Sequence, residues 1–427
     1  MRRRARAAFP IFKNVFCILL GALMRENVEE RKNIRIPARK IQCQKFSETP
    51  CKNIFSVLSW LQNYNFVNKL SACHELGWRK YCGGAGTPCP AAERREGVVI
   101  VRTPFRMSFA GGGTDFAEFF REHGGEVLSA TIDRYCYVTV RHLPGFFEYR
   151  SEFCYSEIER VSGSSEIRHP LIREAVRMLD MQQIRLTYEA DLPARSGLGT
   201  SSAFAVGMLN AFHCSRGEYA SKRQLADEAI RLERELCQEA GGLQDQVAVS
   251  FGGLNRITFG ENGYAVRPVI LTTARREMLN ERLMLFFTGF SRFSFEIQEK
   301  TRDRLGDSTD SLLEMKGLVG DAERILTGGG GLSDFGRLLD YGWQLKRGVN
   351  SEISTDSVDM VYEKAKQAGA LGGKLLGAGG GGFLLLYAEP ERQEAVRQAL
   401  AGLLYVPFRF EDSGTEVVYY APDTRPF

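Results

Sequence analysis

The sequence lacks the features by which several specialised classes of protein are recognised. Its 10 cysteines form no Cys-x-x-Cys pair and none of the spacings typical of metal sites. An apolar run at residues 15–24 is much shorter than the ~20 residues that a membrane-spanning helix needs. We therefore expect no stable membrane span and, because nothing requires an oxidising compartment, a cytoplasmic protein.

Two familiar nucleotide-binding patterns are absent as well. No Lys follows Gly199 at the place where the common P-loop, G-x-x-x-x-G-K-[ST], requires one. Asp334-Phe335-Gly336 matches the metal-binding triplet of protein kinases, but the chain has neither of the partner motifs of that family. We therefore discard both readings.

The chain also has little excess of either charge, with a formal net charge of +4. Residues 1–97 contain 18 Lys or Arg and 7 Glu, a net charge of +11, which leaves −7 for residues 98–427. A mildly acidic body argues against a nucleic-acid-binding surface there. The composition is otherwise that of an ordinary globular protein, long enough for roughly two or three domains.

The first 96 residues show no sustained periodicity, no repeat and no motif. They begin with Arg2, Arg3, Arg4 and Arg6 and continue into the apolar run, as a targeting leader would, but no small-residue cleavage site follows. We interpret residues 1–96 as a flexible or adventitious extension, with a targeting leader as the alternative.

A strand, a glycine turn and a helix follow one another around residue 197. Residues 184–190 alternate between apolar and polar, as in a half-buried strand, and apolar residues recur with helical spacing over 204–212. Glycines let backbone N–H groups approach a ligand, and a helix start favours an anion, most often phosphate. The alternative is a helix cap alone. The candidate residues are Arg195, Ser196, Gly197, Leu198, Gly199, Thr200, Ser201 and Ser202.

Another strand that ends in glycines comes earlier in the body. Alternating apolar residues over 105–109 lead to three glycines at 111–113. Thr114 and Asp115 follow, so a carboxylate lies where backbone and ligand can approach closely. The alternative is that Asp115 only caps the helix expected at 116–123.

Two carboxylates further along the chain have positions that suggest chemistry. Residues 219–240 have the pattern of one long helix, and Glu233 lies on its apolar stripe. A buried carboxylate needs a cation or several donors, so we expect either Mg²⁺ or an arginine beside it. Asp245, twelve residues later, begins a short segment and is either a helix cap or a reactive acid.

The second half of the body follows a loosened pattern at residues 267–282, which we interpret as a domain junction. A strand at 283–287 and helices near 308–326, 333–349 and 354–369 come next. A second glycine-rich loop then leads into an apolar strand. Its candidate residues are Lys374, Gly377, Gly379, Gly380 and Gly381.

Together, these motifs resemble those of the GHMP kinases, the family of galactokinase, homoserine kinase and mevalonate kinase. Residues 193–203 are similar to the family's second motif, P-x-x-x-G-L-G-S-S-A, with Thr200 in place of the commoner Ser. Residues 374–382 resemble the third, K-x-x-G-A-G-x-G-G. The first, R-x-S-F-x-G-G-G-T-D at 106–115, resembles the form found in heptose 7-phosphate kinases and fucokinases. The likeness covers residues 97–427.

The resemblance implies an α+β protein with the two-domain GHMP kinase fold. Residues 97–275 would form an N-terminal α+β domain that contains a left-handed βαβ unit and the phosphate loop. Residues 276–427 would form a C-terminal, ferredoxin-like α+β domain. The active site would lie in the cleft between the two domains.

The resemblance also implies a role for each candidate residue. ATP phosphates would bind the loop at 195–202, while Ser201 and Glu233 would hold Mg²⁺, because galactokinases place a metal-binding Glu twelve residues before an Asp-Gln pair. Asp245 would be the catalytic carboxylate that receives or orients the proton of the sugar hydroxyl. The sugar and its phosphate would be bound by Gly113, Thr114, Asp115, Arg292 and Lys374, with Lys346 and Arg347 as further cationic candidates.

The implied function is ATP-dependent phosphorylation of the anomeric hydroxyl of a sugar phosphate, with heptose 7-phosphate as the first candidate. The implied cofactors are ATP and Mg²⁺. The partner would be a small sugar phosphate, not a nucleic acid or a membrane, and a homodimer is left open. One alternative is another GHMP small-molecule kinase, such as a fucokinase or galactokinase. The other is a regulator that binds sugar and ATP without turnover.

Overall fold

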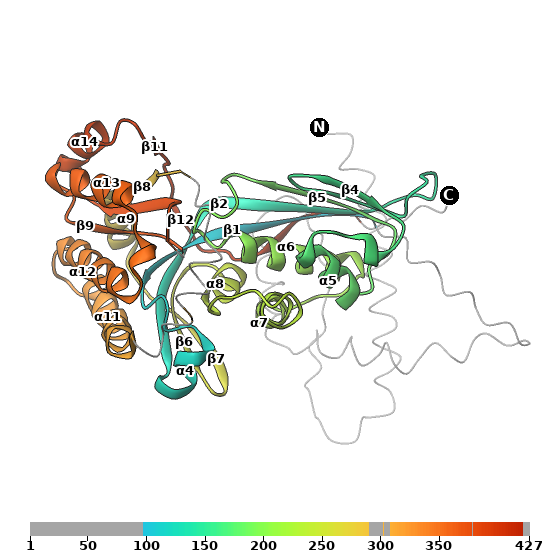
Figure 1. Cartoon of the computed structure of the whole chain (residues 1–427), viewed down its shortest axis with the longest axis horizontal. Coiled ribbons are helices and arrows are strands. Elements are labelled where there is room, and N and C mark those ends of the chain that lie inside the picture. Colours follow the sequence, from blue (N-terminus) through green and yellow to red (C-terminus); the bar gives the residue numbers. More distant parts are fainter. Residues whose placement is uncertain (1–96, 290–301, 303–307, 378, 422–427) are drawn as a thin grey trace, which may run out of the picture. The chain divides into compact units, whose positions relative to one another are not determined.

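The computed structural model describes residues 97–289, 302, 308–377 and 379–421. The predicted extension at 1–96 and the candidate ligand Arg292 lie outside the described residues. The described part forms two lobes, each built on its own β-sheet (Figure 1).

The first lobe contains a nine-stranded sheet with the order β13-β1-β2-β5-β3-β4, to which β6, β7 and β12 add through β2. Its strand β1 (Val98–Ala110) is continuous over 13 residues, because the apolar stretches at its two ends join without a break. The other strands of this part are β2 (Gly125–His142), β3 (Ser151–Cys154), β4 (Ile158–Val161), β5 (Ile184–Ala190), β6 (Leu254–Gly260) and β7 (Gly263–Pro268).

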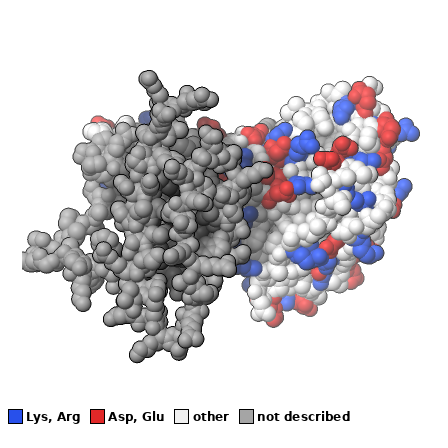
Figure 2. Space-filling model, turned by 180° about the vertical axis from the view of Figure 1, so that it is seen from behind, with Lys and Arg blue, Asp and Glu red and all other residues white. Residues whose placement is uncertain are grey.

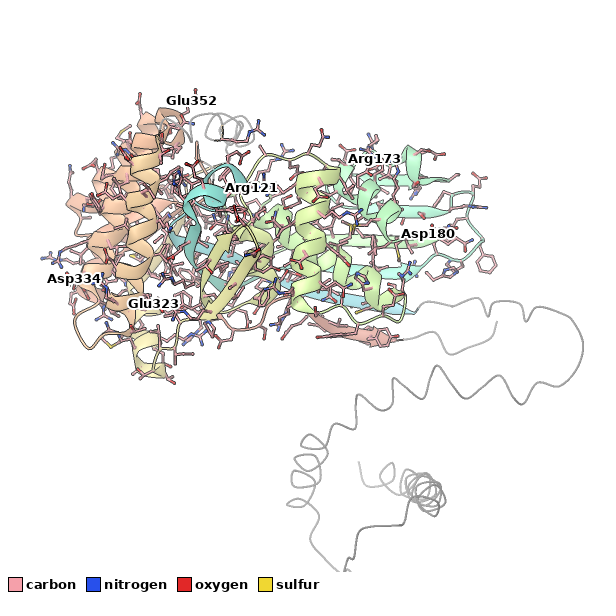
Figure 3. The ribbon with its side chains drawn as sticks, turned by 90° about the horizontal axis from the view of Figure 1, so that it is seen from below. Arg121, Arg173, Asp180, Glu323, Asp334 and Glu352 are labelled. Atoms are coloured by element: carbon pink, nitrogen blue, oxygen red, sulfur yellow. The ribbon has the colours of Figure 1, made fainter. Side chains whose placement is uncertain are left out.

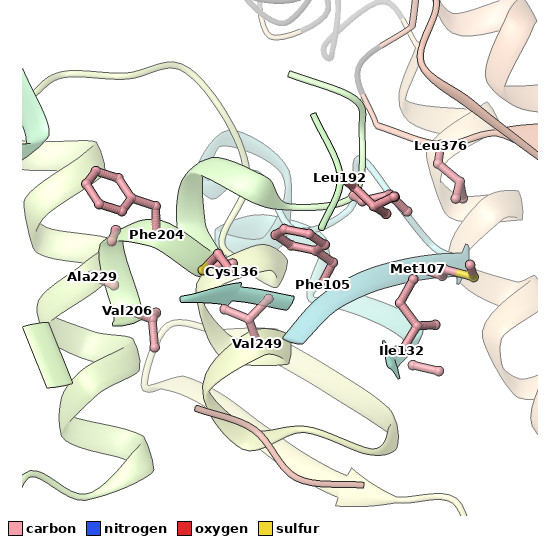
Figure 4. Close-up of a cluster of buried hydrophobic side chains, with 14 of the residues drawn as sticks. Phe105, Met107, Ile132, Cys136, Leu192, Phe204, Val206, Ala229, Val249 and Leu376 are labelled. Atoms are coloured by element: carbon pink, nitrogen blue, oxygen red, sulfur yellow. The ribbon is translucent and has the colours of Figure 1, made fainter. Parts of the chain in front are cut away.

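Helices cover one face of this sheet (Figure 1), and they are α5 (Pro170–Met178), α6 (Thr200–Ser215), α7 (Lys222–Ile230) and α8 (Gln244–Phe251). A further helix, α4 (Ala117–His123), follows the first glycine turn. Helix α6 is buried along nearly its whole length, as expected for a helix that is apolar on every side. Its Phe204 and Val206 belong to the same buried cluster as Phe105 of β1 and Cys136 of β2 (Figure 4).

The single long helix predicted for residues 219–240 is wrong. The regular α-helix α7 ends at Ile230, and Arg231–Leu236 forms a wider π-helix, in which the N–H of Cys237 donates to the carbonyl of Leu232 at 2.9 Å. The chain leaves the helix at Gln238, whose φ is +53°. Turns of the π type are rare and often mark functional positions, and this one contains Glu233.

The second lobe is an antiparallel sheet of β8 (Leu283–Phe287), β9 (Gly372–Leu375), β10 (Phe383–Tyr387) and β11 (Leu404–Tyr405) in the order β11-β8-β10-β9. Its helices are α11 (Thr309–Thr327), α12 (Ser333–Val349), α13 (Asp356–Gln367) and α14 (Pro390–Ala399). The strand order 4-1-3-2 and the β-α-β-β-α-β sequence are those of a ferredoxin-like lobe. The predicted α+β fold class is confirmed.

The end of the chain departs from the predicted division at residue 276. Strands β12 (Phe410–Glu411) and β13 (Glu416–Ala421) leave the second lobe and pair with β2 and β1 of the first sheet. The stretch interpreted as a loosened junction also has structure, because α9 (Thr273–Arg282) occupies it. The C-terminal domain is therefore not a continuous stretch that runs to the end of the chain.

Apolar and polar contacts join the two lobes. Leu376 of the second lobe belongs to the same buried cluster as Met107 of β1 (Figure 4). Glu323 of α11, labelled in Figure 3, forms ion pairs with Arg256 of β6 at 2.9 Å and with Arg267 of β7 at 2.6 Å. None of the described helices is both long and apolar enough to cross a bilayer.

Candidate active site between the lobes

The predicted phosphate loop has the expected strand, turn and helix. Gly199 is the residue before α6 and has a left-handed backbone, with φ +71° and ψ +28°. Gly197 also has positive φ, and a Cβ there would lie 2.2 Å from the carbonyl oxygen of Leu376. Both positions therefore require glycine, one for the turn and one for close contact with the second lobe.

The third-motif loop packs directly on the phosphate loop. The N–H of Phe383 donates to the carbonyl of Ser196 at 3.2 Å, and a Cβ at Gly377 would lie 2.3 Å from Cα of Gly197. On its other side, the N–H of Gly380 donates to the carbonyl of Ile353 at 2.9 Å. The phosphate loop of the first lobe is thus in direct backbone contact with the second lobe.

Asp245, at the start of α8, forms a bidentate ion pair with Arg106 of β1. Its Oδ1 accepts from Nε at 2.8 Å and its Oδ2 accepts from Nη2 at 2.7 Å. Nη1 of Arg106 donates to the carbonyl of Gly197 at 2.7 Å. The backbone N–H of Arg106 donates to the carbonyl of Leu198 at 3.0 Å. One buried guanidinium therefore connects the first motif, the phosphate loop and the candidate catalytic acid.

Arg106 is part of the first motif but was not among the predicted site residues. A signal was present, because Arg106 is a charge in the middle of a strand that is apolar at both neighbouring positions. A buried guanidinium needs a carboxylate partner. The sequence does not indicate which carboxylate that is, since the partners are 139 residues apart.

Asp115 does not cap the helix that follows it, because the N-cap of α4 is Phe116. Its carboxylate instead accepts from the N–H of Gly113 at 2.9 Å and from the N–H and side-chain amide of Gln244 at 3.1 and 3.2 Å. Burial raises the pKa of Asp115, against the effect of these hydrogen bonds. The hydroxyl of Thr114 is used within the turn, where it donates to the carbonyls of Gly111 and Glu126.

Glu233 is buried, as predicted, and an arginine, one of its two expected partners, lies beside it. The hydroxyl of Ser202 donates to its two carboxylate oxygens at 2.9 and 3.1 Å, the side-chain amide of Gln246 donates to Oε2, and Nη2 of Arg234 lies 3.6 Å from that oxygen. Ser201, the hydroxyl predicted to bind the metal, lies in the first turn of α6, and its metal role stays a prediction. Ser201 faces solvent in the first turn of α6, whereas the next residue, about 100° further round the helix, faces Glu233.

The surroundings of Glu233 fit a divalent cation. Within the described ranges, no group of three His, Cys, Asp or Glu side chains could hold a metal. Mg²⁺ does not require one, because it usually binds one or two carboxylates together with water and substrate phosphates. Burial raises the pKa of Glu233 to about 7, although Arg234 acts in the opposite direction. Arg234 and the hydrogen bonds from Ser202 and Gln246 therefore do not fully offset the cost of burying the negative charge of Glu233.

A pocket between the lobes is lined by residues of the first and third motifs and by Asp245, but by neither Glu233 nor the residues of the phosphate loop. The first lobe contributes Asp115, Asp245, Arg106 and Arg234, and the second contributes two lysines, Lys346 of α12 and Lys374 of β9. Four cations thus line the pocket together with two carboxylates. Apolar contacts are provided by Phe116, Leu312, Met315, Val349 and Ile353.

The two lysines hold the second lobe to the motif loops. Nζ of Lys346 donates to the carbonyl of Gly377 at 2.5 Å, and Nζ of Lys374 donates to that of Phe109 at 3.1 Å. Burial lowers the pKa of both ammonium groups, that of Lys346 to about 8, and nearby Arg106 adds to the effect. Arg347 is not a pocket residue, because it pairs with Asp359 of α13 at 3.1 Å.

Several buried polar atoms around this pocket have no hydrogen-bond partner in the part of the chain that the structure describes. They are Oγ of Ser108 and Ser196 and the side-chain carbonyl oxygens of Gln244 and Gln246. Buried polar groups are normally satisfied, so unpaired ones at a pocket are suited to a ligand or to water. On the described surface seen in Figure 2, acidic and basic side chains are interspersed.

Comparisons with known proteins agree with this arrangement. The family model for the GHMP kinases N terminal domain matches residues 170–253, and the model for the GHMP kinases C terminal region matches 322–405. D-glycero-alpha-D-manno-heptose 7-phosphate kinase of Campylobacter jejuni is 31% identical over 325 residues, which are 71% of this chain and 93% of that protein. The L-fucokinase/L-fucose-1-P guanylyltransferase of Bacteroides fragilis is 26% identical over 341 residues, 70% of this chain and 35% of that protein.

Solved structures extend the comparison to the fold. A D-glycero-D-manno-heptose 1-phosphate kinase from Bacteroides thetaiotaomicron superposes with a TM-score of 0.62 at 27% identity, covering 76% of this chain and 99% of that chain. The likeness thus includes both lobes and both glycine loops. With two domain models matched in order and a relative 31% identical along nearly its full length, this chain belongs to the GHMP kinase family, among its sugar kinases.

Proposed function

We propose that this chain transfers the γ-phosphoryl group of ATP to the anomeric hydroxyl of a sugar phosphate. The first candidate is D-glycero-D-manno-heptose 7-phosphate, which would become the 1,7-bisphosphate. The observation that supports this most is the pocket beside the phosphate loop, where four cationic side chains accompany two carboxylates. Such an excess of positive charge suits a substrate that itself carries phosphate.

Asp245 has the position required of the group that accepts or orients the hydroxyl proton. Its carboxylate lines the pocket, and Arg106 fixes it from one side through two hydrogen bonds. A carboxylate has about four lone-pair directions, so each oxygen retains capacity for a sugar hydroxyl. Asp115 accepts a hydrogen bond from Gln244, the residue before Asp245, and would bind further hydroxyls of the sugar.

The phosphate loop would bind the ATP phosphates through backbone N–H groups at the start of α6. Mg²⁺ would be held by Glu233 together with a hydroxyl from the first turn of α6, that of Ser201 as predicted or that of Ser202, and its chemistry is to neutralise the phosphate oxygens during transfer. The π-helix and the hydrogen bonds from Ser202 and Gln246 keep the Glu233 carboxylate in place.

The substrate class rests on the pocket charge together with the names of the similar kinases. Those names refer to heptose 7-phosphate, heptose 1-phosphate and L-fucose. The similar kinases therefore share a sugar as the class of substrate and differ in which sugar it is and in whether it carries a phosphate. A phosphorylated sugar is favoured over a free one because Lys346 and Lys374 line the pocket and pair with no carboxylate among the described residues, and a buried cation without an anion is unfavourable.

The test is ADP release by the purified chain with ATP, Mg²⁺ and a panel of acceptors. The panel contains heptose 7-phosphate, sugar 6-phosphates, the free sugars and mevalonate. We expect kcat/KM to be at least about 100-fold higher for a phosphorylated sugar than for its free form, the effect of one or two charge-assisted hydrogen bonds. A preference for free sugars would contradict the substrate class. ATP and sugar binding without ADP release would favour the sensing regulator.

A further inference from the structure

Lys346 is the pocket cation that lies beside the reacting groups. Its ammonium group donates to the carbonyl of Gly377, and Gly377 is in backbone contact with Gly197 of the phosphate loop. Arg106, the partner of Asp245, donates to the carbonyl of that same Gly197. The ammonium of Lys346 therefore lies near the contact between the two glycine loops, and Asp245 is close enough to influence it electrostatically. Under the proposed function, this is the region where the phosphate of ATP would meet the hydroxyl.

The remaining hydrogen-bonding capacity of Lys346 is directed to this pocket. An ammonium has three donors, and across the described residues one of them has an acceptor, the Gly377 carbonyl. Lys346 forms no ion pair with any described carboxylate, although Asp115 and Asp245 are near enough to influence it electrostatically. Lys374 of β9 is buried and donates to the carbonyl of Phe109, and burial together with the nearby cations Lys346 and Arg106 lowers its pKa.

We propose, on the basis of the proposed function, that Lys346 is a further catalytic residue whose ammonium group contacts the γ-phosphoryl group during its transfer. It binds a non-bridging oxygen of that group and stabilises the negative charge on it in the transition state. Because Lys346 belongs to α12, this contact would make the second lobe a necessary part of the catalytic site.

The transfer step is balanced without any additional reactant. The anomeric oxygen forms a bond to the γ-phosphorus, and the bond between that phosphorus and the β,γ-bridging oxygen breaks, leaving its electron pair on ADP. The hydroxyl proton passes to the carboxylate of Asp245. Lys346 keeps its own proton and acts through hydrogen bonding and charge alone.

The alternative role for Lys346 is to bind the phosphate already present on the sugar. Its location argues against that role, because a 7-phosphate is at the opposite end of the sugar from the anomeric hydroxyl, and that hydroxyl must be at Asp245. The pocket has another cation for that phosphate, Arg234 of the first lobe, which lines it together with Gly241 and Gly242.

The first test compares Lys346→Met and Lys346→Arg with Arg347→Met as the matched control. Arg347 is adjacent in sequence but pairs with Asp359 outside the pocket. We expect Lys346→Met to lower kcat about 100- to 1,000-fold with the KM for the sugar changed less than threefold, Lys346→Arg to restore part of the rate, and Arg347→Met to match the wild type. A raised KM with unchanged kcat would overturn the proposal in favour of the substrate-phosphate role.

A second measurement does not depend on turnover or on the identity of the sugar. Calorimetry with ADP and with the non-hydrolysable analogue AMP-PNP separates contacts to the γ-phosphoryl group from contacts to the rest of the nucleotide. We expect Lys346→Met to weaken AMP-PNP binding about tenfold or more, the effect of one charge-assisted hydrogen bond, and to leave ADP binding within twofold. Unchanged AMP-PNP binding, or an equal loss for ADP, would overturn the proposal.

The pH profile gives a signature that a purely structural lysine would lack. The pKa of Lys346 is lowered to about 8 by burial and by Arg106, so kcat/KM should fall as pH rises through about 8. Asp115, Asp245 and Lys374 also face it, and the pKa of Lys374 is lowered too. Lys346→Arg isolates its contribution, because arginine stays charged and should move this limb to higher pH. An unmoved limb in that variant would contradict the assignment.

The proposed kinase function and the proposed role of Lys346 can be refuted separately. If the wild-type chain binds neither nucleotide, the proposed kinase function falls and the role of Lys346 falls with it. If the wild type binds both nucleotides and phosphorylates a sugar while Lys346→Met does the same at an equal rate, the proposal for Lys346 falls alone.

Discussion

At the scale of single residues, the site depends on carboxylates that are held in place by hydrogen bonds. Asp245 accepts two hydrogen bonds from Arg106, whose Nη1 donates to the Gly197 carbonyl of the phosphate loop. Glu233 is held by Ser202 and Gln246. Each acid therefore has a fixed direction before any ligand arrives, which is the condition for an acid that must meet a hydroxyl or a cation at one point.

Replacing Asp245 by Asn should lower kcat about 100- to 10,000-fold, the usual contribution of a positioned acid or base. ADP and AMP-PNP affinity should stay within a few-fold, because the phosphate loop is unchanged. The matched control is Asp334→Asn, which alters an exposed acid on α12 that pairs with Arg337. Thermal unfolding is measured alongside, since breaking a buried ion pair is destabilising. A fully active Asp245→Asn would remove the catalytic assignment.

At the scale of elements, two glycine loops from different lobes make backbone contact. Gly197 and Gly377 approach so closely that neither has room for a Cβ, and the N–H of Phe383 donates to the carbonyl of Ser196. The phosphate loop is thus shaped by its neighbour as much as by its own sequence. Helix α6 begins at the end of this loop and is fixed by almost complete burial.

The contact can be tested with Gly197→Ala against Gly217→Ala. Both glycines have positive φ, +86° and +73°, so both variants should lose about 1 kcal/mol or slightly more of unfolding free energy from backbone strain. Only Gly197→Ala adds a clash, with its Cβ 2.2 Å from the Leu376 carbonyl, while position 217 is open. We expect a larger fall in unfolding midpoint and a large loss of kcat for Gly197→Ala alone. Equal effects in the two variants would show that the loops can separate freely.

At the scale of the whole molecule, the chain crosses from the first lobe to the second and returns. Strand β13 pairs with β1, and Arg102 of β1 forms an ion pair with Glu416 of β13 at 2.9 Å. Between β12 and β13, the buried hydroxyl of Thr415 meets the hydroxyl of Thr103 at 2.9 Å and the side-chain amide of Asn210 at 3.1 Å. The C-terminal residues are therefore part of the first lobe's core.

Because the end of the chain packs into the first lobe, we expect a substitution at Thr415 to affect stability, although its partner Thr103 is more than 300 positions away in sequence. Thr415→Val should lower the free energy of unfolding by about 1–3 kcal/mol, because it leaves the buried side chains of Thr103 and Asn210 without a partner. Thr415→Ser keeps the hydroxyl and should lose less. Chemical denaturation of the two variants and the wild type is the measurement. If valine and serine behave alike, the hydroxyl contributes nothing to stability.

Much of the fold and part of the site were accessible from sequence. The phosphate loop, the buried position of Glu233, the third glycine loop and the α+β fold class follow from periodicity, from glycines at turns and from motif order. The π-helix was missed, because its residues have the same apolar stripe as an α-helix and differ in one extra residue per turn. The hydrogen bond from Ser202 to Glu233 was also missed, because packing decides which side of a helix's first turn meets a given residue.

The sequence by itself determined the local elements and the family, because hydrophobic period and glycine spacing act over a few residues and survive in the linear order of the chain. Only the tertiary structure decided that Arg106 meets Asp245, that Lys346 lies beside both, and that β13 closes the first sheet. These contacts join residues far apart in the chain. A buried charge specifies that it needs a partner of opposite sign, and the fold selects which one it meets.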